Sequence, residues 1–573
     1  MKKRFLYSTL SVVLLLSAAI NTNACTNFLF TKGATVDGST MITYAADSHV
    51  LYGELYYRPA MDFPEGSMFD VYEWDTGKFL GKIKQVRHTY SVIGNMNEYQ
   101  VAIGETTYGG RSELHHQPSA IMDYGGLMYI TLQRAKTARE AIKIMGELVD
   151  EYGYYSEGES FSISDPNEVW IMEMIGKGKD EHGAVWVARL VPDGYICGHA
   201  NQARITTFPQ GKKNSITSKN LDKIFDPKIE CVYSYDVISF AKEKGYYKGK
   251  DKNFSFSDTY APVDFSGARF CEIRVWAMFN RVNSHMAKYF DYAKGNVKYA
   301  DDENHYATNR MPLWIKPDKK VSIHEVMNLM RDHLEGTELD MSKDIGAGPF
   351  GLPYRWRGLT WKVGDNTYVN ERATSTQQTG FSFIAQGRSW IPDPIGGIFW
   401  FGVDDSYSCV YVPMYCGMTR VPETYAVGNG DMLTYSDNSA FWIFNTVSNF
   451  AYLKYNVMIK DIKKVQNELE TKFIAYTPAV DAAAAELYKT NKDLAREFIT
   501  DYSCNQGNNT VKRWKKLAQY LLVRYKDGNE MKYKDGKFER TPYGGAVYPN
   551  QPGYPQWWYK EIIKQTGDKF KLK

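Results

Sequence analysis

The architecture of this chain depends most on ACTNFLFTKGATVDGSTMITYAAD, residues 24–47 of 573. Positively charged residues 2–4 come before it, followed by an apolar run, residues 10–20, of the length found in export signals. Small residues directly precede Cys25, as at a cleavage site. We therefore expect residues 1–24 to be a signal peptide, Cys25 to be the mature N-terminus, and the protein to be periplasmic or secreted.

An N-terminal cysteine carries a nucleophile and a base on one residue. Its α-amine has an unperturbed pKa of about 7.7 to 8.0 and its thiol one of about 8.5, so the amine can take the thiol proton at small cost. The amine then takes the place of the histidine in a Cys-His pair, as it does in enzymes with an N-terminal threonine. The position of Cys25 therefore favours nucleophilic catalysis.

Three other roles compete for Cys25. It could be a small buried residue, a disulfide partner, or the lipidated cysteine of a surface lipoprotein that binds peptides or glycans. A lipoprotein signal has a Leu-like residue three positions before the cysteine, where this chain has Thr22. The lipoprotein interpretation is therefore disfavoured.

Two short β-patterned runs, residues 26–31 and 40–46, are separated by Gly-containing turn signals and predict a hairpin. Folding the hairpin about residue 35 brings Cys25 opposite the end of the second strand. Asp47 is then the first ionisable side chain expected to reach the new N-terminus. A carboxylate there can hold or orient the amine, although Asp47 could equally be a polar residue that ends an edge strand.

The charge and hydropathy of the whole chain exclude several classes of protein. The formal net charge is +3, without a long basic run, so neither nucleic acid nor an anionic membrane surface is expected as a partner. Beyond the signal there is no apolar stretch of about 18 residues, so no transmembrane segment is expected. The 15% aromatic content indicates a sheet-rich core more than a surface for stacking on sugars or peptides.

The cysteines give no sign of a metal site. Seven are too sparse for a disulfide scaffold, and none lies in a CxxC or His-containing spacing. His324-Glu325 has no second histidine at the spacing of a zinc protease helix. No metal and no cofactor is therefore expected. Cys409 and Cys416 could form a disulfide in an oxidising compartment or remain two buried thiols.

Hydrophobic periodicity divides the chain after the hairpin into a mixed body and a helical end. We expect a main domain over residues 25–445, and a C-terminal helical layer with an aromatic tail over residues 446–573. In the body we predict strands within 86–105, 161–164, 168–175, 184–190 and 195–200, a helix at 138–149 with a capping box at Thr137 and Glu140, a second capping box at Ser322 and Glu325, and a solvated turn at Asp404-Asp405. In the C-terminal layer we predict helices at 449–473, 478–501 and 510–525.

Several motifs in order resemble one known family. They are Cys25-Thr26-Asn27-Phe28, Asp37-Gly38-Ser39-Thr40-Met41-Ile42, Gly104-Glu105, Gly158-Glu159-Ser160-Phe161 and Gly346-Ala347-Gly348-Pro349-Phe350-Gly351. The chain resembles the dipeptidase A type cysteine dipeptidases, which are N-terminal-nucleophile hydrolases related to choloylglycine hydrolase and penicillin V acylase. The resemblance implies an α+β fold, a four-layer αββα sandwich, in this chain with a C-terminal helical extension. It also implies a cysteine dipeptidase that cleaves dipeptides or short peptides through an acyl-enzyme.

The resemblance assigns roles to five residues. Cys25 matches the nucleophile and amine base, and Asp47 matches the aspartate that holds the N-terminal amine. Asn97, in Asn97-Glu98, resembles the asparagine on the oxyanion side. Asn201 resembles the asparagine that positions the N-terminus and substrate, and Arg269 resembles the arginine that favours the thiolate.

One departure and one alternative accompany this resemblance. Many relatives carry Arg-Asn where this chain has Tyr44-Ala45, and a tyrosine can donate one hydrogen bond but brings no charge. The alternative is an amidase of the same fold that acts on an N-acyl conjugate such as a bile salt or penicillin. An apolar acyl pocket would favour the amidase, and groups placed for a free α-amine would favour the dipeptidase. The sequence leaves a homo-oligomer open.

Overall fold

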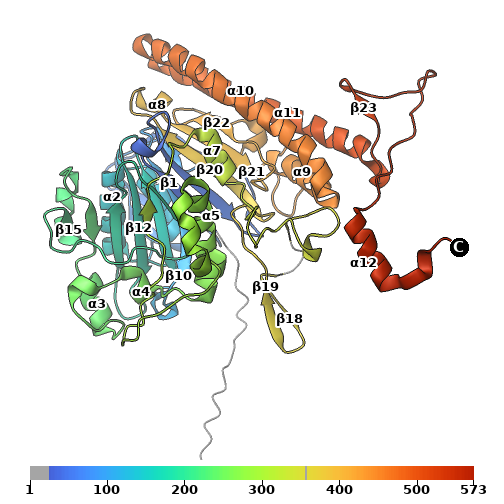
Figure 1. Cartoon of the computed structure of the whole chain (residues 1–573). Helices are drawn as coiled ribbons and strands as arrows, with labels where there is room; N and C mark the ends of the chain where they lie inside the picture. Colours follow the sequence, from blue (N-terminus) through green and yellow to red (C-terminus); the bar gives the residue numbers. More distant parts are fainter. Residues whose placement is uncertain (1–24, 355–357) are drawn as a thin grey trace, which may run out of the picture.

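The computed structural model describes residues 25–354 and 358–573 (Figure 1). The predicted signal peptide, residues 1–24, lies outside the described residues. Two large β-sheets make up the body, and helices accompany both, so the predicted α+β class is confirmed.

The first sheet has seven strands and contains the predicted N-terminal hairpin. In sheet order its strands are β17 (Trp314–Ile315), β14 (Ile196–His199), β1 (Asn27–Phe30), β2 (Thr40–Asp47), β20 (Thr379–Gly387), β21 (Ile398–Val403) and β22 (Val412–Tyr415). β1 and β2 pair antiparallel with Leu29 opposite Ile42, and Thr26 bridges Ala45. Cys25 therefore lies beside the end of β2, as the hairpin prediction required.

The second sheet has nine strands. In sheet order they are β15 (Ser215–Thr217), β16 (Cys231–Tyr233), β13 (Ala184–Leu190), β12 (Val169–Gly176), β11 (Gly158–Ser164), β10 (Ala102–Gly109), β9 (Met96–Asn97), β8 (Val92–Ile93) and β3 (Tyr57–Arg58). The pairs are antiparallel except for β15 with β16. The central strands are buried on both faces, because β10, β11 and β12 contact β2 of the first sheet on one side and helices cover the other side.

Helices cover the outer face of each sheet. α1 (Tyr124–Leu132) and α2 (Ala138–Tyr152) pack against β10, β11 and β13 and share one hydrophobic core with them. α9 (Ala440–Leu453), α10 (Tyr455–Thr490) and α11 (Lys492–Arg524) pack against β21 and β22. Figure 1 shows α10 and α11 as two long helices side by side along one edge of the molecule. The inner face of the first sheet therefore packs against the second sheet.

Shorter elements complete the chain. They are α3 (Val237–Glu243), α4 (Phe256–Tyr260), α5 (Ile273–Val282), α6 (Phe290–Ala293), α7 (Ile323–Leu329), α8 (Asp393–Gly396), α12 (Gln556–Thr566) and the strand pairs β4 (Met61–Asp62) with β7 (His88–Thr89), β5 (Met68–Tyr72) with β6 (Phe79–Lys84), β18 (Thr360–Val363) with β19 (Asn366–Val369), and β23 (Tyr533–Lys534) with β24 (Lys537–Phe538). The tail with α12 lies at one side of the molecule in Figure 1, and its Tyr554 packs against Phe350, with the ring centroids 5.8 Å apart. None of the helices among the described residues has both the length and the apolar character that crossing a membrane requires.

The helix caps follow the sequence closely. Thr137 caps α2 by accepting a hydrogen bond from the Glu140 amide (3.1 Å), but the Glu140 carboxylate bonds the amide of Lys136, one residue before the predicted partner. The capping box of Ser322 and Glu325 is present at the start of α7. Both helices therefore begin where their side chains satisfy the free amides of the first turn.

Three predictions about local structure were wrong. The predicted gap between residues 501 and 510 is absent, because α11 is continuous from Lys492 to Arg524, and the helices of this layer are instead separated at Lys454 and Asn491. The predicted helix break before Pro478 is absent, because α10 runs through this proline, and the Thr477 hydroxyl bonds the Phe473 carbonyl (2.9 Å) in the same turn. Asp404 and Asp405 do not form a solvated turn. Both are buried, since Asp404 bonds the side chains of Asn445 and Ser448 on α9.

The disulfide considered for Cys409 and Cys416 is also absent. All seven cysteines are free, and both of these thiols are fully buried. Cys25 is therefore one of seven free thiols, and its distinction comes from its surroundings.

Candidate active site

Cys25 lies in a cavity of about 290 Å³ between the two sheets. The polar side chains that line this cavity include Cys25, Tyr44, Asp47, Asp75, Glu105, Thr107 and Tyr124. Tyr44 and Asp47 come from β2 of the first sheet, and Glu105 comes from β10 of the second. The site therefore forms only when the two sheets pack against each other.

The Cys25 sulfur contacts one side chain from each sheet. Cys25 Sγ lies 3.5 Å from Tyr44 Oη and 3.6 Å from Glu105 Oε1, and the Tyr44 hydroxyl donates to the same Glu105 oxygen (2.5 Å). Burial, together with the charges of Glu105 and Asp47, raises the pKa of the Cys25 thiol well above its usual value. Because this environment disfavours a thiolate, the thiol needs a base close to it to react near neutral pH.

Asp47 is held beside Cys25 by two partners from the first sheet's side of the cavity. Its carboxylate accepts hydrogen bonds from Arg372 Nη2 (2.6 Å) and from the hydroxyl of Thr379 on β20 (2.7 Å). The register of β2 against β20 shifts at this point, between Ala46 and Asp47. Such a bulge turns a side chain out of the regular alternation, and in this strand it accompanies a carboxylate beside the thiol. Burial raises the pKa of Asp47, and the charge of Arg372 opposes that rise.

Arg274 fixes the first peptide unit of the described chain. It lies on α5 and donates from Nη1 to the Cys25 carbonyl (2.6 Å) and the Thr26 hydroxyl (2.8 Å). From Nη2 it donates to the Asn201 side-chain carbonyl (2.9 Å). The Asn201 amide in turn donates to the Thr107 carbonyl at the cavity wall (2.6 Å). Burial lowers the pKa of Arg274 to about 10, so the side chain stays charged near neutral pH.

The structure brings three of the five predicted site residues together and leaves two apart. Cys25 and Asp47 line the cavity, and Asn201 reaches Cys25 through Arg274. Asn97 lies outside the cavity, and both hydrogens of its amide donate to backbone carbonyls, those of Leu132 and Ala135 (both 2.7 Å). The oxyanion role expected for Asn97 therefore has no geometric support, because no donor is left to offer.

Arg269 also lies outside the cavity. It is in the π-helical turn before α5 and pairs with Glu371 at 3.9 Å. The position expected for it, next to Cys25, is occupied by Arg274, five residues later. A sequence motif that places an arginine near the nucleophile does not by itself say which of two nearby arginines turns inward.

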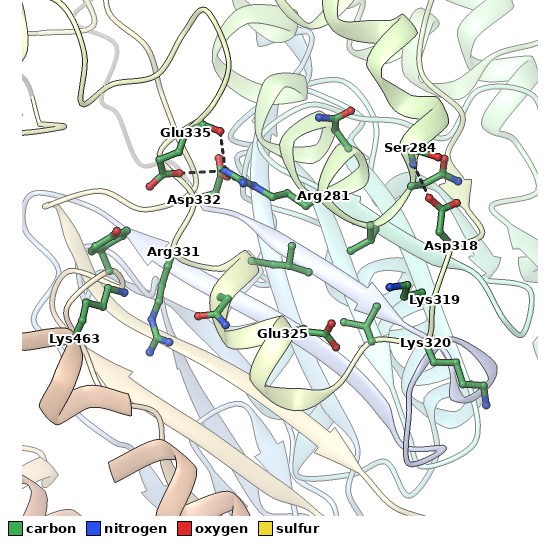
Figure 2. A pocket seen from close by; sticks show the side chains of 17 residues that line it. Arg281, Ser284, Asp318, Lys319, Lys320, Glu325, Arg331, Asp332, Glu335 and Lys463 are labelled. Atoms are coloured by element: carbon green, nitrogen blue, oxygen red, sulfur yellow. Dashed lines mark hydrogen bonds and ion pairs between the residues drawn. The ribbon is translucent and has the colours of Figure 1, made fainter. Parts of the chain in front are cut away.

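A larger cavity of about 660 Å³ lies between the end of α5, α7 and α10 (Figure 2). None of the predicted site residues lines it. Arg281 pairs with Asp332 (2.5 Å) and Glu335 (3.2 Å), as the dashed lines in Figure 2 mark. Among the described residues, no group of three or more His, Cys, Asp or Glu side chains is arranged to hold a metal ion.

Comparison with known proteins identifies the family of this chain. Residues 24–468 match Peptidase family C69. The chain belongs to peptidase family C69. It is therefore a cysteine-type peptidase, and the C69 match begins one residue before Cys25 and ends within α10.

Curated relatives of this C69 peptidase carry dipeptidase names. A "Probable dipeptidase" of Latilactobacillus sakei is 23% identical over 84% of this chain and 93% of that protein. A "Probable dipeptidase B" of Streptococcus pyogenes serotype M1 is 22% identical over 91% of this chain and 97% of that protein. A "Probable dipeptidase" of Salmonella dublin is 24% identical over 69% of this chain and 81% of that protein. The C69 chain thus resembles dipeptidases over most of its length.

Sequence reasoning missed several residues of the C69 site. Glu105 belongs to one of the family motifs but had no predicted role, and Arg274, Arg372 and Asp75 were not singled out. A signal for Glu105 exists in the sequence, since a glutamate in a strand buried on both faces needs a partner. Arg274 and Arg372 have no comparable signal, because Cys25 and Asp47, the partners that place them at the site, lie more than 240 residues away in the sequence.

Proposed function

We propose that this C69 peptidase is an exported cysteine dipeptidase whose nucleophile is the thiol of an N-terminal Cys25. The observation that carries the proposal is the position of Cys25. The residue that would follow signal cleavage is also the residue whose sulfur lies in a cavity between two sheets, next to Tyr44 and Glu105. The arrangement of helices, two sheets and helices supports assigning the fold to the four-layer αββα sandwich of N-terminal-nucleophile hydrolases.

The first step activates the sulfur. The high pKa of the Cys25 thiol in this cavity means that ionisation needs a local base, and cleavage after Ala24 would provide one in the freed α-amine. The proton moves from Sγ to this amine. The Asp47 carboxylate, held by Arg372 and Thr379, is placed to stabilise the resulting ammonium.

The next steps exchange two bonds at the scissile carbonyl carbon. Cys25 Sγ forms a bond to this carbon, and the carbonyl electron pair moves to oxygen to give a tetrahedral intermediate. The Tyr44 hydroxyl lies 3.5 Å from the sulfur and donates its one proton to Glu105, so it can serve this oxyanion only by exchanging that bond for one to the substrate. We assign it this role in place of Asn97. The carbon–nitrogen bond then breaks, and the leaving amine takes its proton from the Cys25 ammonium. A water molecule attacks the acyl-enzyme with the amine again acting as base, which releases the second product.

The test compares the exported wild-type protein with Cys25→Ser and with Cys271→Ser, a control that removes another free, partly exposed thiol. We expect Cys25→Ser to lose at least about 10³-fold in kcat on dipeptides and Cys271→Ser to stay within about twofold. The substrate panel includes N-acyl amino acids and penicillin V. Preference for those substrates over dipeptides would support the amidase instead, and full activity of Cys25→Ser would reject the nucleophile.

A further inference from the structure

The cavity around Cys25 is acidic. Asp75, in the loop between β5 and β6, and Glu105 on β10 both line it, and no Lys, Arg or His is among the described residues that do so. The third carboxylate of the cavity, Asp47, forms an ion pair with Arg372 (2.6 Å). No described cation forms an ion pair with Asp75 or Glu105, in contrast to the larger cavity of Figure 2, where Arg281 pairs with Asp332 and Glu335.

The position of Asp75 is fixed although its side chain is exposed. Asp123 caps α1 through a bond from the Gly126 amide (2.8 Å) and accepts a second bond from the amide of Trp74 (2.7 Å), which ties the β5–β6 loop to the start of the helix. Tyr124, the first residue of α1, donates its hydroxyl to Asp75 Oδ1 (2.9 Å). These contacts hold the Asp75 carboxylate at the cavity wall.

Glu105 carries the negative charge deeper in the cavity. Its side chain is buried and accepts a hydrogen bond from the Tyr44 hydroxyl, and the Glu159 side chain lies beside it. Burial and the charge of Glu105 raise the pKa of Glu159 well above its usual value. Burial also raises the pKa of Glu105, but the hydrogen bond from Tyr44 opposes that rise, so of the two glutamates Glu105 is the one more stabilised in its charged form.

The cavity thus places two carboxylates, Asp75 and Glu105, where no described Lys, Arg or His pairs with them. In the mature form the Cys25 amine supplies at most one positive charge. This single charge cannot pair with both Asp75 and Glu105. A buried carboxylate such as Glu105 is costly to ionise without a cation, and Asp75 adds a second carboxylate at the cavity wall, so a cationic ligand is the natural complement.

The covalent geometry of a peptide indicates which cationic group of a substrate would lie next to these carboxylates. The α-amino nitrogen of a peptide's first residue lies about 2.5 Å from the carbonyl carbon of the same residue. When Cys25 Sγ attacks that carbon, the α-ammonium group must lie within a few ångströms of the sulfur. Glu105 Oε1, at 3.6 Å from Sγ, is within that range, and Asp75 lies on the same cavity wall as Tyr124.

We propose that Asp75 and Glu105 form a subsite for the free α-ammonium group of the substrate, so that the enzyme cleaves after the first residue of a peptide with an unblocked N-terminus. This inference rests on the proposed function, since it places the scissile carbonyl at Cys25. It adds a specific recognition element, and it separates dipeptides from N-acyl conjugates, which have an uncharged amide at the same position.

The experiment uses the mature enzyme with Ala-Ala and with N-acetyl-Ala-Ala as matched substrates. We expect kcat/KM for the acetylated peptide to be at least about 100-fold lower. Asp75→Asn should raise KM for Ala-Ala about tenfold with kcat within about threefold, because Asp75 binds the substrate without contacting the sulfur. The control is Asp70→Asn, a carboxylate on β5 of the same hairpin that pairs with Lys82 (2.8 Å) and does not line the cavity. Its KM should equal that of the wild type.

The possible results separate the two proposals. If the wild type cleaves neither peptide, nor any other peptide of the panel, the proposed function fails. If it cleaves Ala-Ala and the acetylated peptide equally well, or if Asp75→Asn has an unchanged KM, peptide cleavage stands and the ammonium subsite is rejected. Equal thermal unfolding temperatures for both variants and the wild type establish that a change in KM reflects binding.

Discussion

At the scale of single residues, the site depends on side chains that hold other groups in place. Arg274 is the clearest case, because its guanidinium is fully buried and joins the Cys25 carbonyl, the Thr26 hydroxyl and Asn201. A planar group with several donors can serve these acceptors at once, whereas the single ammonium of lysine cannot match the same geometry. The orientation of Cys25 therefore depends on an arginine that does not line the cavity.

We predict that Arg274→Lys lowers kcat on dipeptides about 100-fold, because displacing the nucleophile by about 1 Å has an effect of this size. The matched variant is Arg269→Lys, which alters an ion pair of 3.9 Å with Glu371 outside the cavity and should change kcat less than about threefold. Steady-state kinetics with one dipeptide measures both. The opposite order of effects would assign the positioning role to Arg269 and refute it for Arg274.

At the scale of secondary structure, the two sheets are joined by polar contacts as well as by apolar packing. His199 on β14 of the first sheet bonds Thr106 on β10 through Nδ1 and Ser162 on β11 through Nε2, both at 2.7 Å. The imidazole is fully buried, and burial lowers its pKa to about 3. His199 is therefore neutral in the folded protein at any pH at which the enzyme would work.

This depressed pKa predicts a loss of stability in acid. The unfolded chain takes up a proton at His199 below about pH 6.5, and the folded chain does so only near pH 3, so the free energy of unfolding falls as the pH falls through this window. Between pH 7 and pH 4.5 the loss from this residue is about 3 kcal/mol. Urea denaturation of wild type and His199→Gln at both pH values measures it. The variant should lack about 3 kcal/mol of the wild-type pH dependence, and identical pH dependence in the two proteins would refute a neutral buried His199.

Hairpins and helix caps were predictable where the residues that form them lie close together in the sequence. The β1–β2 hairpin, the cap at Thr137 and the capping box at Ser322 follow from residues within one or two turns of each other. Asp404 was misjudged because its partners, Asn445 and Ser448, come from a helix about 40 residues later in the sequence. Turn residues predict that the chain reverses direction. They do not predict whether a helix from later in the sequence will bury the turn.

At the scale of the whole molecule, the site is a product of the packing of the two sheets. Cys25 and Tyr44 belong to the first sheet, and Glu105 belongs to the second, so the contacts of Glu105 with the other two, at 3.6 and 2.5 Å, exist only across the interface. The sequence was sufficient to predict that Cys25 and Asp47 lie together and that the fold is of the α+β class. It could not predict Arg274, Arg372 or Asp75, because their positions follow from long-range packing that leaves no periodic signal.

The central claim is that removal of residues 1–24 creates the catalytic base, and the most direct measurement compares two forms of the same enzyme. One begins at Cys25, and the other keeps a single additional alanine, Ala24, before it, with the N-terminal sequence of each established by intact mass. Because an acylated nitrogen cannot take the thiol proton, we predict that the form with Ala24 retains the fold but loses at least about 10³-fold in kcat on dipeptides. Equal kcat values for the two forms would contradict the account.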